Sequence, residues 1–252
     1  MRDGKKKTED GMKDKKVVRK KIIDEIKTQF LDALFPPRCP ICDEIIGSKE
    51  VIHRECYQKL RPYPMRNIVN EYGRRQSENN LDDGRTLFAY EKEAKPMMYR
   101  FKYDNRRDYA SFFAKEITRR YKGWMEQNKI DLIVPVPMYK KNEKVRGYNQ
   151  ANCLAKELSK EMEIAWNGRL VKRIKKTPAL KDLSAEKRKN NLKNAFHMEE
   201  DIVKYSYILI VDDIYTTGST AQELAGVLKA HGAKKVYIIT VCKGDYYERN
   251  EL

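Results

Sequence analysis

Four side chains between residues 39 and 56 have the types and the spacing of a metal site. Cys39 and Cys42 form one pair, and His53 and Cys56 form a second pair after ten intervening residues. Short pairs joined by a loop can place four donors around one tetrahedral zinc ion. Unrelated reduced thiols are the alternative, but the matched spacing of the two pairs favours a ligand set. Because four protein ligands leave no open position, we predict a structural zinc ion.

A second group of polar side chains follows an apolar segment later in the chain. Residues 207–211 have the pattern of a buried strand, and Asp212 and Asp213 come directly after them, at the edge where parallel sheets bind ligands. Two carboxylates there can accept hydrogen bonds from a ribose diol or help to hold magnesium. The next residues combine hydroxyl groups and glycine before a predicted helix: Thr216, Thr217, Gly218, Ser219 and Thr220. Since a helix N-terminus favours phosphate, the segment predicts a ribose-phosphate site.

The hydroxyl-rich turn has a simpler explanation as an ordinary helix N-cap. An N-cap alone does not require the apolar strand, the two acids and the glycine to occur in unbroken order, so the order favours a ligand loop. No Gly-Lys-Ser/Thr element of the Walker type is present, which argues against an ordinary ATPase.

The elements that must position these groups alternate between strand and helix. Strands are expected near residues 86–90, 131–136, 207–211 and 236–241, and apolar residues recur at helical spacing over 109–124, 151–158 and 221–228. This alternation predicts an α/β fold, a parallel sheet with helices on both faces. We expect three regions: a disordered basic tail over 1–20, a helix and zinc module over 21–66, and the sheet domain over 84–252. A polar stretch from Asn67 to Asp83 is expected to be a linker or an extended loop.

Composition places the chain among globular proteins with a strongly basic surface. The net charge is +16, with 36% charged and 40% hydrophobic residues. No apolar run is long enough to span a membrane and no secretory signal is seen, so we expect a cytoplasmic protein. The charge would attract a polyanion such as nucleic acid, although a lysine-rich solvated surface explains it equally well.

Three further segments carry a resemblance to a known family. They are Val134-Pro-Val-Pro137, Arg146-Gly-Tyr-Asn-Gln150, and Leu183-Ser184 followed by Arg188, Asn191, Ala195 and Phe196. With the loop at 212–220, they make the chain resemble a type I phosphoribosyltransferase, and more closely the ComF family of competence proteins. Two departures are visible: Leu180 stands where relatives tend to have Gln, and His53 stands where a zinc-binding cysteine is common.

The resemblance implies a ligand and a biological role. The ligand would be phosphoribosyl pyrophosphate with magnesium, and the loop after Pro137 would face its pyrophosphate side, with Arg146 and Lys140 as the cations. The role would be in DNA uptake during natural transformation, handling single-stranded DNA with other competence proteins. The basic stretch from Lys172 to Lys193 could line a groove for the DNA backbone.

Two other functions remain open at this stage. An active phosphoribosyltransferase of nucleotide metabolism or salvage is the alternative, and a catalytically silent sensor of phosphoribosyl pyrophosphate is a third. No aromatic or amide pair is marked out for reading a base edge, and no catalytic residue is assigned. Fold alone does not choose between these functions.

Overall fold

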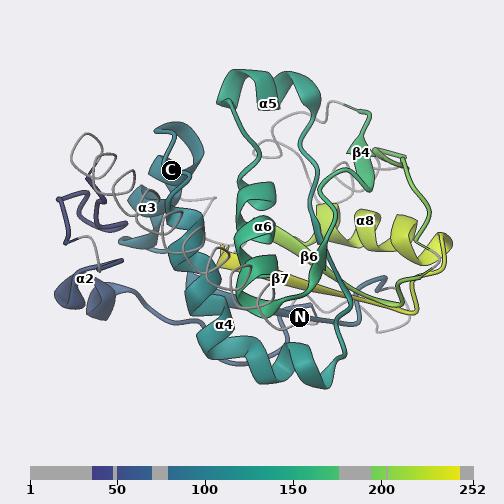
Figure 1. Cartoon of the computed structure of the whole chain (residues 1–252), viewed down its shortest axis with the longest axis horizontal. Helices are drawn as coiled ribbons and strands as arrows, with labels where there is room; N and C mark the ends of the chain where they lie inside the picture. The colour runs from purple at the N-terminus through teal and green to yellow at the C-terminus, as the bar shows by residue number, and fades with distance from the viewer. Residues whose placement is uncertain (1–35, 48–49, 70–78, 176–193, 203, 245–252) are drawn as a thin grey trace, which may run out of the picture. The chain divides into compact units, whose positions relative to one another are not determined.

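The computed structural model describes residues 36–47, 50–69, 79–175, 194–202 and 204–244 (Figure 1). The chain forms two compact units, Met1–Cys56 and Tyr57–Leu252. The expected basic tail, Leu180 and most of the basic stretch from Lys172 to Lys193 fall outside the described residues.

The described part of the first unit, residues 36–47 and 50–56, contains a small buried cluster. Its buried cluster consists of Cys39, Ile46 and Cys56, with Ile41 and Ile52 packed against it. A turn closes after Cys39, where Asp43 takes a positive φ of 64° and donates its backbone N–H to the Cys39 carbonyl over 2.9 Å. The helix α2 (Arg54–Lys59) starts in this unit and ends in the second.

The second unit is built on a five-stranded parallel sheet with the strand order β1-β7-β6-β2-β3. These strands are β1 (Asp83–Ala89), β2 (Leu132–Pro135), β3 (Ala165–Trp166), β6 (Tyr207–Tyr215) and β7 (Lys235–Lys243). A separate antiparallel pair joins β4 (Val171–Arg173) to β5 (Phe196–Met198). The expected fold class is confirmed: the strands predicted near 86–90, 131–136, 207–211 and 236–241 are β1, β2, β6 and β7.

Helices cover both faces of this sheet. They are α4 (Tyr109–Gln127), α6 (Gln150–Met162) and α8 (Ser219–Ala230). The helix α3 (Ala94–Tyr103) also buries an apolar face, whereas α5 (Lys140–Arg146) has no buried residue. Ile208 and Ile210 of β6 lie in the core cluster that contains Leu224 of α8. Because side chains alternate along a strand, Leu209 and Val211 face the opposite side, where α6 packs on β2 and β6 and α4 packs on α6 (Figure 1).

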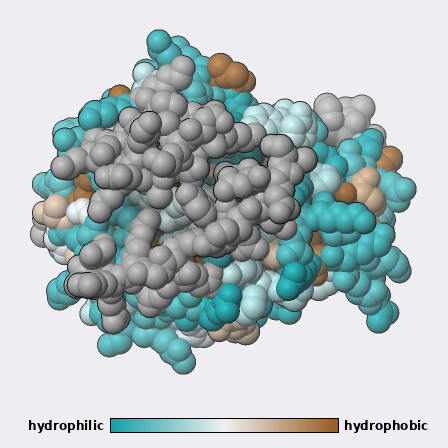
Figure 2. All heavy atoms as spheres, turned by 180° about the vertical axis from the view of Figure 1, so that it is seen from behind, coloured by the Kyte–Doolittle hydropathy of each residue, from teal (hydrophilic) through white to brown (hydrophobic). Residues whose placement is uncertain are grey.

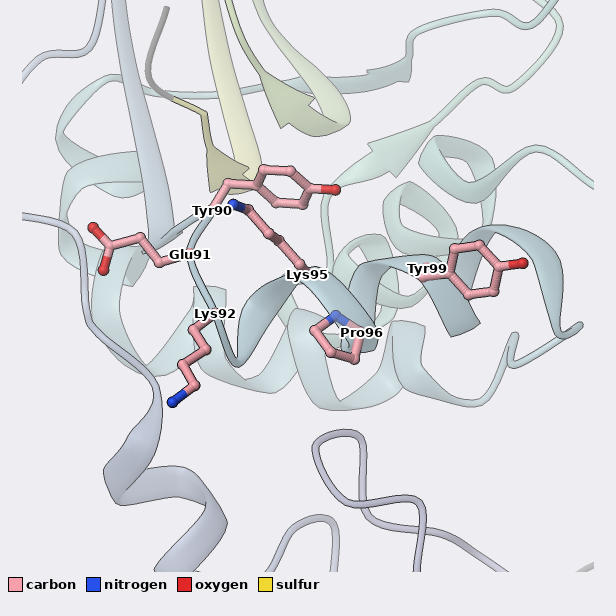
Figure 3. A pocket seen from close by; sticks show the side chains of 6 residues that line it. All are labelled: Tyr90, Glu91, Lys92, Lys95, Pro96 and Tyr99. Atoms are coloured by element: carbon pink, nitrogen blue, oxygen red, sulfur yellow. The ribbon is translucent and has the colours of Figure 1, made fainter. Parts of the chain in front are cut away.

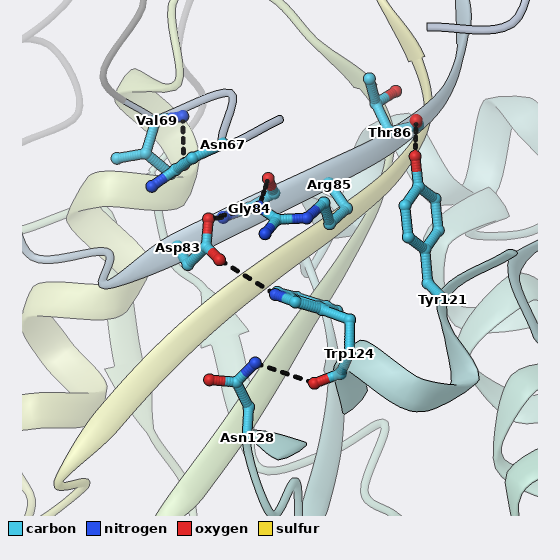
Figure 4. Close-up of polar contacts among 9 residues, drawn as sticks. All are labelled: Asn67, Val69, Asp83, Gly84, Arg85, Thr86, Tyr121, Trp124 and Asn128. Atoms are coloured by element: carbon cyan, nitrogen blue, oxygen red, sulfur yellow. Dashed lines mark hydrogen bonds and ion pairs between the residues drawn. The ribbon is translucent and has the colours of Figure 1, made fainter. Parts of the chain in front are cut away.

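Polar side chains fasten α4 to the edge strand β1 (Figure 4). Trp124 donates its indole N–H to Asp83 over 2.9 Å, and Tyr121 donates its hydroxyl to the Thr86 carbonyl over 2.6 Å. Arg85 pairs with Asp83 and lies 4.9 Å from the centre of the Trp124 ring. These contacts fix the strand that leads into α3.

The stretch between Asn67 and Asp83 is more than a linker at its described ends. Ile68 and Val69 are fully buried in the core, and their side chains lie against Gly84 so closely that a Cβ there would come within about 3.1 Å of each. At the other end, Gln222 of α8 accepts the backbone N–H groups of Asn80 and Leu81 over 2.7 and 3.2 Å. Both ends of this stretch therefore belong to the second unit's core.

The described surface is mostly polar. Figure 2 shows hydrophilic residues over most of the coloured area, with hydrophobic residues in small separate groups. Within the described ranges, none of the helices combines the length and the apolar content needed to cross a membrane.

Candidate functional site

The strand β6 carries the acid pair to the carboxyl edge of the sheet. The strand continues past the predicted end at Val211 to Tyr215, so Asp212 and Asp213 lie inside its last part. In the sheet, β6 lies between β2 and β7. The backbone N–H of Asp213 donates to the Asp212 carboxylate over 2.8 Å. The Asp213 carboxylate is paired with Lys102 of α3, with 3.1 Å between the charged atoms. The edge thus holds two acids and a partly buried lysine.

Burial and charge separate the behaviour of these groups. Burial, together with the neighbouring Asp213 charge, raises the pKa of Asp212 to about 7, against the opposing effects of the Asp213 backbone N–H, Lys102 and Arg173. Burial disfavours the charged form of Lys102, but the charge of Asp213 outweighs it and raises the pKa of Lys102. The site therefore holds an ion pair beside a carboxyl group whose pKa is raised to about 7.

The loop after β6 turns at Gly218 into the helix α8. Gly218 has a φ of 71°, and a Cβ on it would lie 2.2 Å from the Tyr215 hydroxyl oxygen, so both backbone conformation and space require glycine. The hydroxyls of Thr217 and Ser219 lie 3.0 Å apart. Gly218 has no side chain to cap α8, and the positive end of the helix dipole faces the loop.

The other predicted loop residues take different positions around this turn. Thr216 lies with its methyl group near Gly244, at the end of β7, and Thr220 is in the first turn of α8. Asp212, Asp213 and the whole hydroxyl loop are therefore contiguous along β6, the turn and α8. Carboxylate acceptors, hydroxyl groups and a helix N-terminus thus follow one another along the chain.

The two cations predicted for the pyrophosphate side have other neighbours in the structure. Arg146, at the end of α5, donates to Gln150 over 3.2 Å and to the Tyr103 hydroxyl over 3.3 Å. Lys140 lines a pocket of about 360 Å³ together with Met138, Lys172 and Arg173. The cations whose charges act on Asp212 are instead Lys102 and Arg173.

The segment from Arg146 to Gln150 holds α3 in place. Tyr148 donates its hydroxyl to the Phe101 carbonyl, and Gln150 donates to the Lys102 carbonyl over 3.2 Å. Asn149 caps α6 at the Ala151 N–H and also donates to the Val136 carbonyl at the end of β2. Since α3 carries Lys102, this motif supports the lysine that pairs with Asp213.

Sequence reasoning missed Lys102 and the helix that carries it. The apolar residues Ala94, Met97, Met98 and Phe101 are buried and recur at helical spacing, which was the available signal for α3. Lys102 is the next residue after Phe101 in this helix. Its role depends on Asp213, which is so far away in sequence that no local pattern predicts the pair.

The cysteine and histidine cluster in the first unit has the geometry of a closed metal site. One donor atom from each of Cys39, Cys42, His53 and Cys56 lies within 4.8 Å of all the others. The Cys42 sulfur and the His53 Nδ1 are 3.3 Å apart, close to the separation of two ligands on one tetrahedral zinc ion. The donor set therefore fits structural zinc.

The thiols also differ in how readily they ionise. Burial opposes a charge on Cys39, but backbone N–H groups of Cys42, His53 and Ile41 stabilise its thiolate and lower the pKa to about 7. Burial and the neighbouring Cys42 and Cys39 raise the pKa of Cys56 to about 12. Three thiols crowded together cannot all ionise without a cation, which is what a zinc ion supplies.

Two family models match the chain. The phosphoribosyl transferase domain model matches residues 114–251, and the double zinc ribbon domain model matches residues 30–82. Residues 30–82 contain three cysteines and one histidine, which make up one complete set of zinc ligands.

Three curated proteins are similar to this chain. The DNA utilization protein YhgH of Escherichia coli is 34% identical over 164 residues, covering 63% of this chain and 70% of that protein. Competence protein F of Haemophilus influenzae is 38% identical over 110 residues, covering 43% of this chain and 48% of that protein. Competence protein ComFC of Bacillus subtilis is 25% identical over 197 residues, covering 77% and 72%.

Proposed function

Because this chain belongs to the phosphoribosyl transferase domain family, among the ComF-type competence proteins with an N-terminal zinc ribbon, we propose that it binds phosphoribosyl pyrophosphate or a related ribose phosphate. We further propose that it handles single-stranded DNA in the cytosol during natural transformation, with other competence proteins.

The line of groups from Asp212 to Thr220 is the observation that carries the ribose-phosphate proposal. The carboxylates of Asp212 and Asp213 would accept the ribose hydroxyls, and the 5-phosphate would lie at the N-terminus of α8. Magnesium held with the ligand by Asp212 or Asp213 would neutralise charge on the pyrophosphate. Lys102 would hold the Asp213 carboxylate in position for this role.

The DNA part of the proposal rests on relatives and on charge. The similar proteins are named for DNA utilization and competence, and this chain carries a net charge of +16. In the described start of the basic stretch, Lys172 is exposed and lies 3.7 Å from Glu199. Arg173 is partly buried, and its charge acts on Asp212. Of these two residues, Lys172 would be the one to meet a DNA backbone.

An active phosphoribosyltransferase is the second candidate, and the Asp212 pKa near 7 favours it. A general base works best when its pKa lies close to the operating pH. A transferase would release pyrophosphate from phosphoribosyl pyrophosphate in the presence of its acceptor. Release that is stimulated by one purine or pyrimidine base, and abolished by Asp212→Asn, would establish this activity.

Calorimetric titration with phosphoribosyl pyrophosphate and magnesium tests the proposed ligand. We expect Asp212→Asn with Asp213→Asn to weaken binding at least tenfold, about 1.4 kcal/mol, because the ligand loses its charged acceptors. The control is Glu161→Gln with Asp201→Asn, which removes two exposed charges elsewhere in the same unit and should bind like the wild type. Equal affinity in all three proteins would show that the ligand does not bind at this site.

Salt dependence tests the proposed DNA binding. Each phosphate contact should contribute a slope of about 0.7 to the plot of log affinity against log salt, because contacts release condensed counterions. Deletion of residues 1–20 or reversal of Lys172 should lower the slope if either region takes part. Absence of binding to single-stranded DNA at about 50 mM salt would contradict the DNA proposal.

A further inference from the structure

The helix α3 exposes two large aromatic side chains on its outer face. Met97, Met98 and Phe101 are fully buried on the inner face, whereas Tyr99 and Tyr103 are 58% and 57% exposed. Exposed aromatic residues that lie together usually mark a binding surface, because burying them would otherwise stabilise the fold. Lys102, between the two faces, reaches Asp213.

The two tyrosines form one surface with an arginine from α5. The ring centres of Tyr99 and Tyr103 are 5.0 Å apart, as expected for residues four apart on a helix. The Arg146 guanidinium carbon lies 5.0 Å from the centre of the Tyr103 ring, and Arg146 also donates to the Tyr103 hydroxyl. We call Tyr99, Tyr103 and Arg146 the tyrosine platform.

The platform continues into an open hollow at the start of α3. Tyr99 lines this hollow, and the other lining residues are Tyr90, Glu91, Lys92, Lys95 and Pro96 (Figure 3). From Lys95 to Tyr103 the helix rises about 12 Å at 1.5 Å per residue.

The charge around the platform selects an anionic partner. Besides Lys102, which pairs with Asp213, the helix α3 contributes Lys95 and Arg100 and no acidic residue. The helix α5 contains four basic residues and one acidic residue. Lys140, Lys141 and Lys144 of α5 are exposed. A polyanion with flat apolar rings therefore matches this surface better than an acidic or an apolar protein segment would.

We propose that the tyrosine platform stacks successive unpaired bases of single-stranded nucleic acid, with the cations of α3 and α5 along its backbone. Base stacking on aromatic side chains tolerates any sequence, because every base has a π-face. This inference rests on the proposed DNA handling and assigns it a surface. The platform adjoins the acid pair through Lys102, so a bound strand would lie beside the ribose-phosphate site.

Binding of fluorescent oligonucleotides by the full chain tests the platform. The probes are a 15-residue thymidine oligonucleotide and an abasic strand with the same number of phosphates. We expect Tyr99→Ala with Tyr103→Ala to weaken thymidine binding at least tenfold and to leave abasic binding unchanged, because only the stacked bases lose their partners. The matched variant Tyr99→Phe with Tyr103→Phe keeps both rings and should bind both strands like the wild type.

The outcomes separate this inference from the function on which it rests. Wild-type protein that binds neither strand would overturn the DNA proposal and the platform together. Wild-type binding that the alanine variant retains in full would overturn the platform alone. An equal loss on both strands would also overturn it, because the rings would then act on the backbone or on the fold. An unchanged thermal midpoint of the alanine variant checks that the fold is intact.

Discussion

The zinc-ligand unit and the sheet unit of this chain are stabilised by different means. The first has a buried cluster of Cys39, Ile46 and Cys56, two of which are metal ligands. The second buries complete strands, with Ile208, Leu209, Ile210 and Val211 of β6 fully inaccessible. Apolar burial can stabilise the sheet without help, whereas the small unit depends on the ion. One chain thus combines a metal-dependent unit with a self-sufficient one.

The two polar sites differ in the same way. Four donors close the zinc site, so it has no position for a substrate. The acid pair lies at the carboxyl edge of the sheet, where burial raises the pKa of Asp212 to about 7. The zinc ligands would thus support structure, whereas the acid pair is the site proposed to bind a ligand.

Removal of one zinc ligand should have the largest effect, and this effect should be confined to the first unit. We expect Cys42→Ala to lose about one zinc ion per chain and to unfold residues 36–56, because metal binding supplies about 10 kcal/mol or more in small zinc modules. Metal analysis and limited proteolysis measure this. The control Cys153→Ala removes a thiol of α6 and should keep the zinc. Full zinc content in Cys42→Ala would refute the ligand set.

A core substitution in the sheet should have the opposite pattern. Ile210→Ala removes a fully buried side chain from β6 and should lower the free energy of unfolding of the second unit by about 2–5 kcal/mol. Denaturant unfolding followed by tryptophan fluorescence measures it, since Trp124 and Trp166 both lie in that unit. Zinc content should not change. The control Val145→Ala alters a side chain that is 91% exposed and should have almost no effect.

A change of pH should alter ligand affinity by a smaller amount, and only through the sheet unit. The raised pKa of Asp212, about 7, means that its carboxyl is protonated below that pH and ionised above it. A ribose hydroxyl or magnesium needs the ionised form, so affinity should rise with pH through about 7, at most tenfold per pH unit. Asp212→Asn, titrated in the same buffers, subtracts the titration of the ligand itself. A wild-type profile parallel to that of Asp212→Asn would contradict the role of this carboxyl.

The smallest expected effect comes from Lys102. Lys102→Gln removes a positive charge that lowers the pKa of Asp212, so the pH midpoint of ligand affinity should move upward. The same calorimetric series measures it. The control Lys160→Gln removes a lysine that pairs with Glu157 on the surface of α6 and should leave the midpoint where it is.

Local patterns predicted the fold and the family, and both predictions are confirmed. The strand before Asp212 and the helix after Gly218 are adjacent in sequence, so their signals add within one short window. The cysteine and histidine pairs predicted a zinc module for the same reason, and the donor cluster with the zinc ribbon match supports structural zinc. The ribose-phosphate role of Asp212 to Thr220 stays a prediction.

Contacts between residues far apart in sequence could not be predicted from local patterns. Lys102 reaches Asp213 across most of the second unit's sequence, and Gln150 positions α3 through a backbone carbonyl that no pattern marks. The family resemblance implies a place for Arg146 on the pyrophosphate side. Its contact with Tyr103 depends instead on how α3 and α5 pack.

Hydrogen exchange of the loop after β6 tests the central claim most directly, because it locates the ligand on the backbone. Phosphoribosyl pyrophosphate with magnesium should slow amide exchange in peptides covering Tyr215 to Gln222, where the N-terminus of α8 would bind the phosphate. Peptides from residues 36–56 should exchange at the same rate with and without the ligand. Saturating ligand that leaves the loop unprotected, or that protects only peptides elsewhere, would contradict the assignment of the ribose-phosphate site.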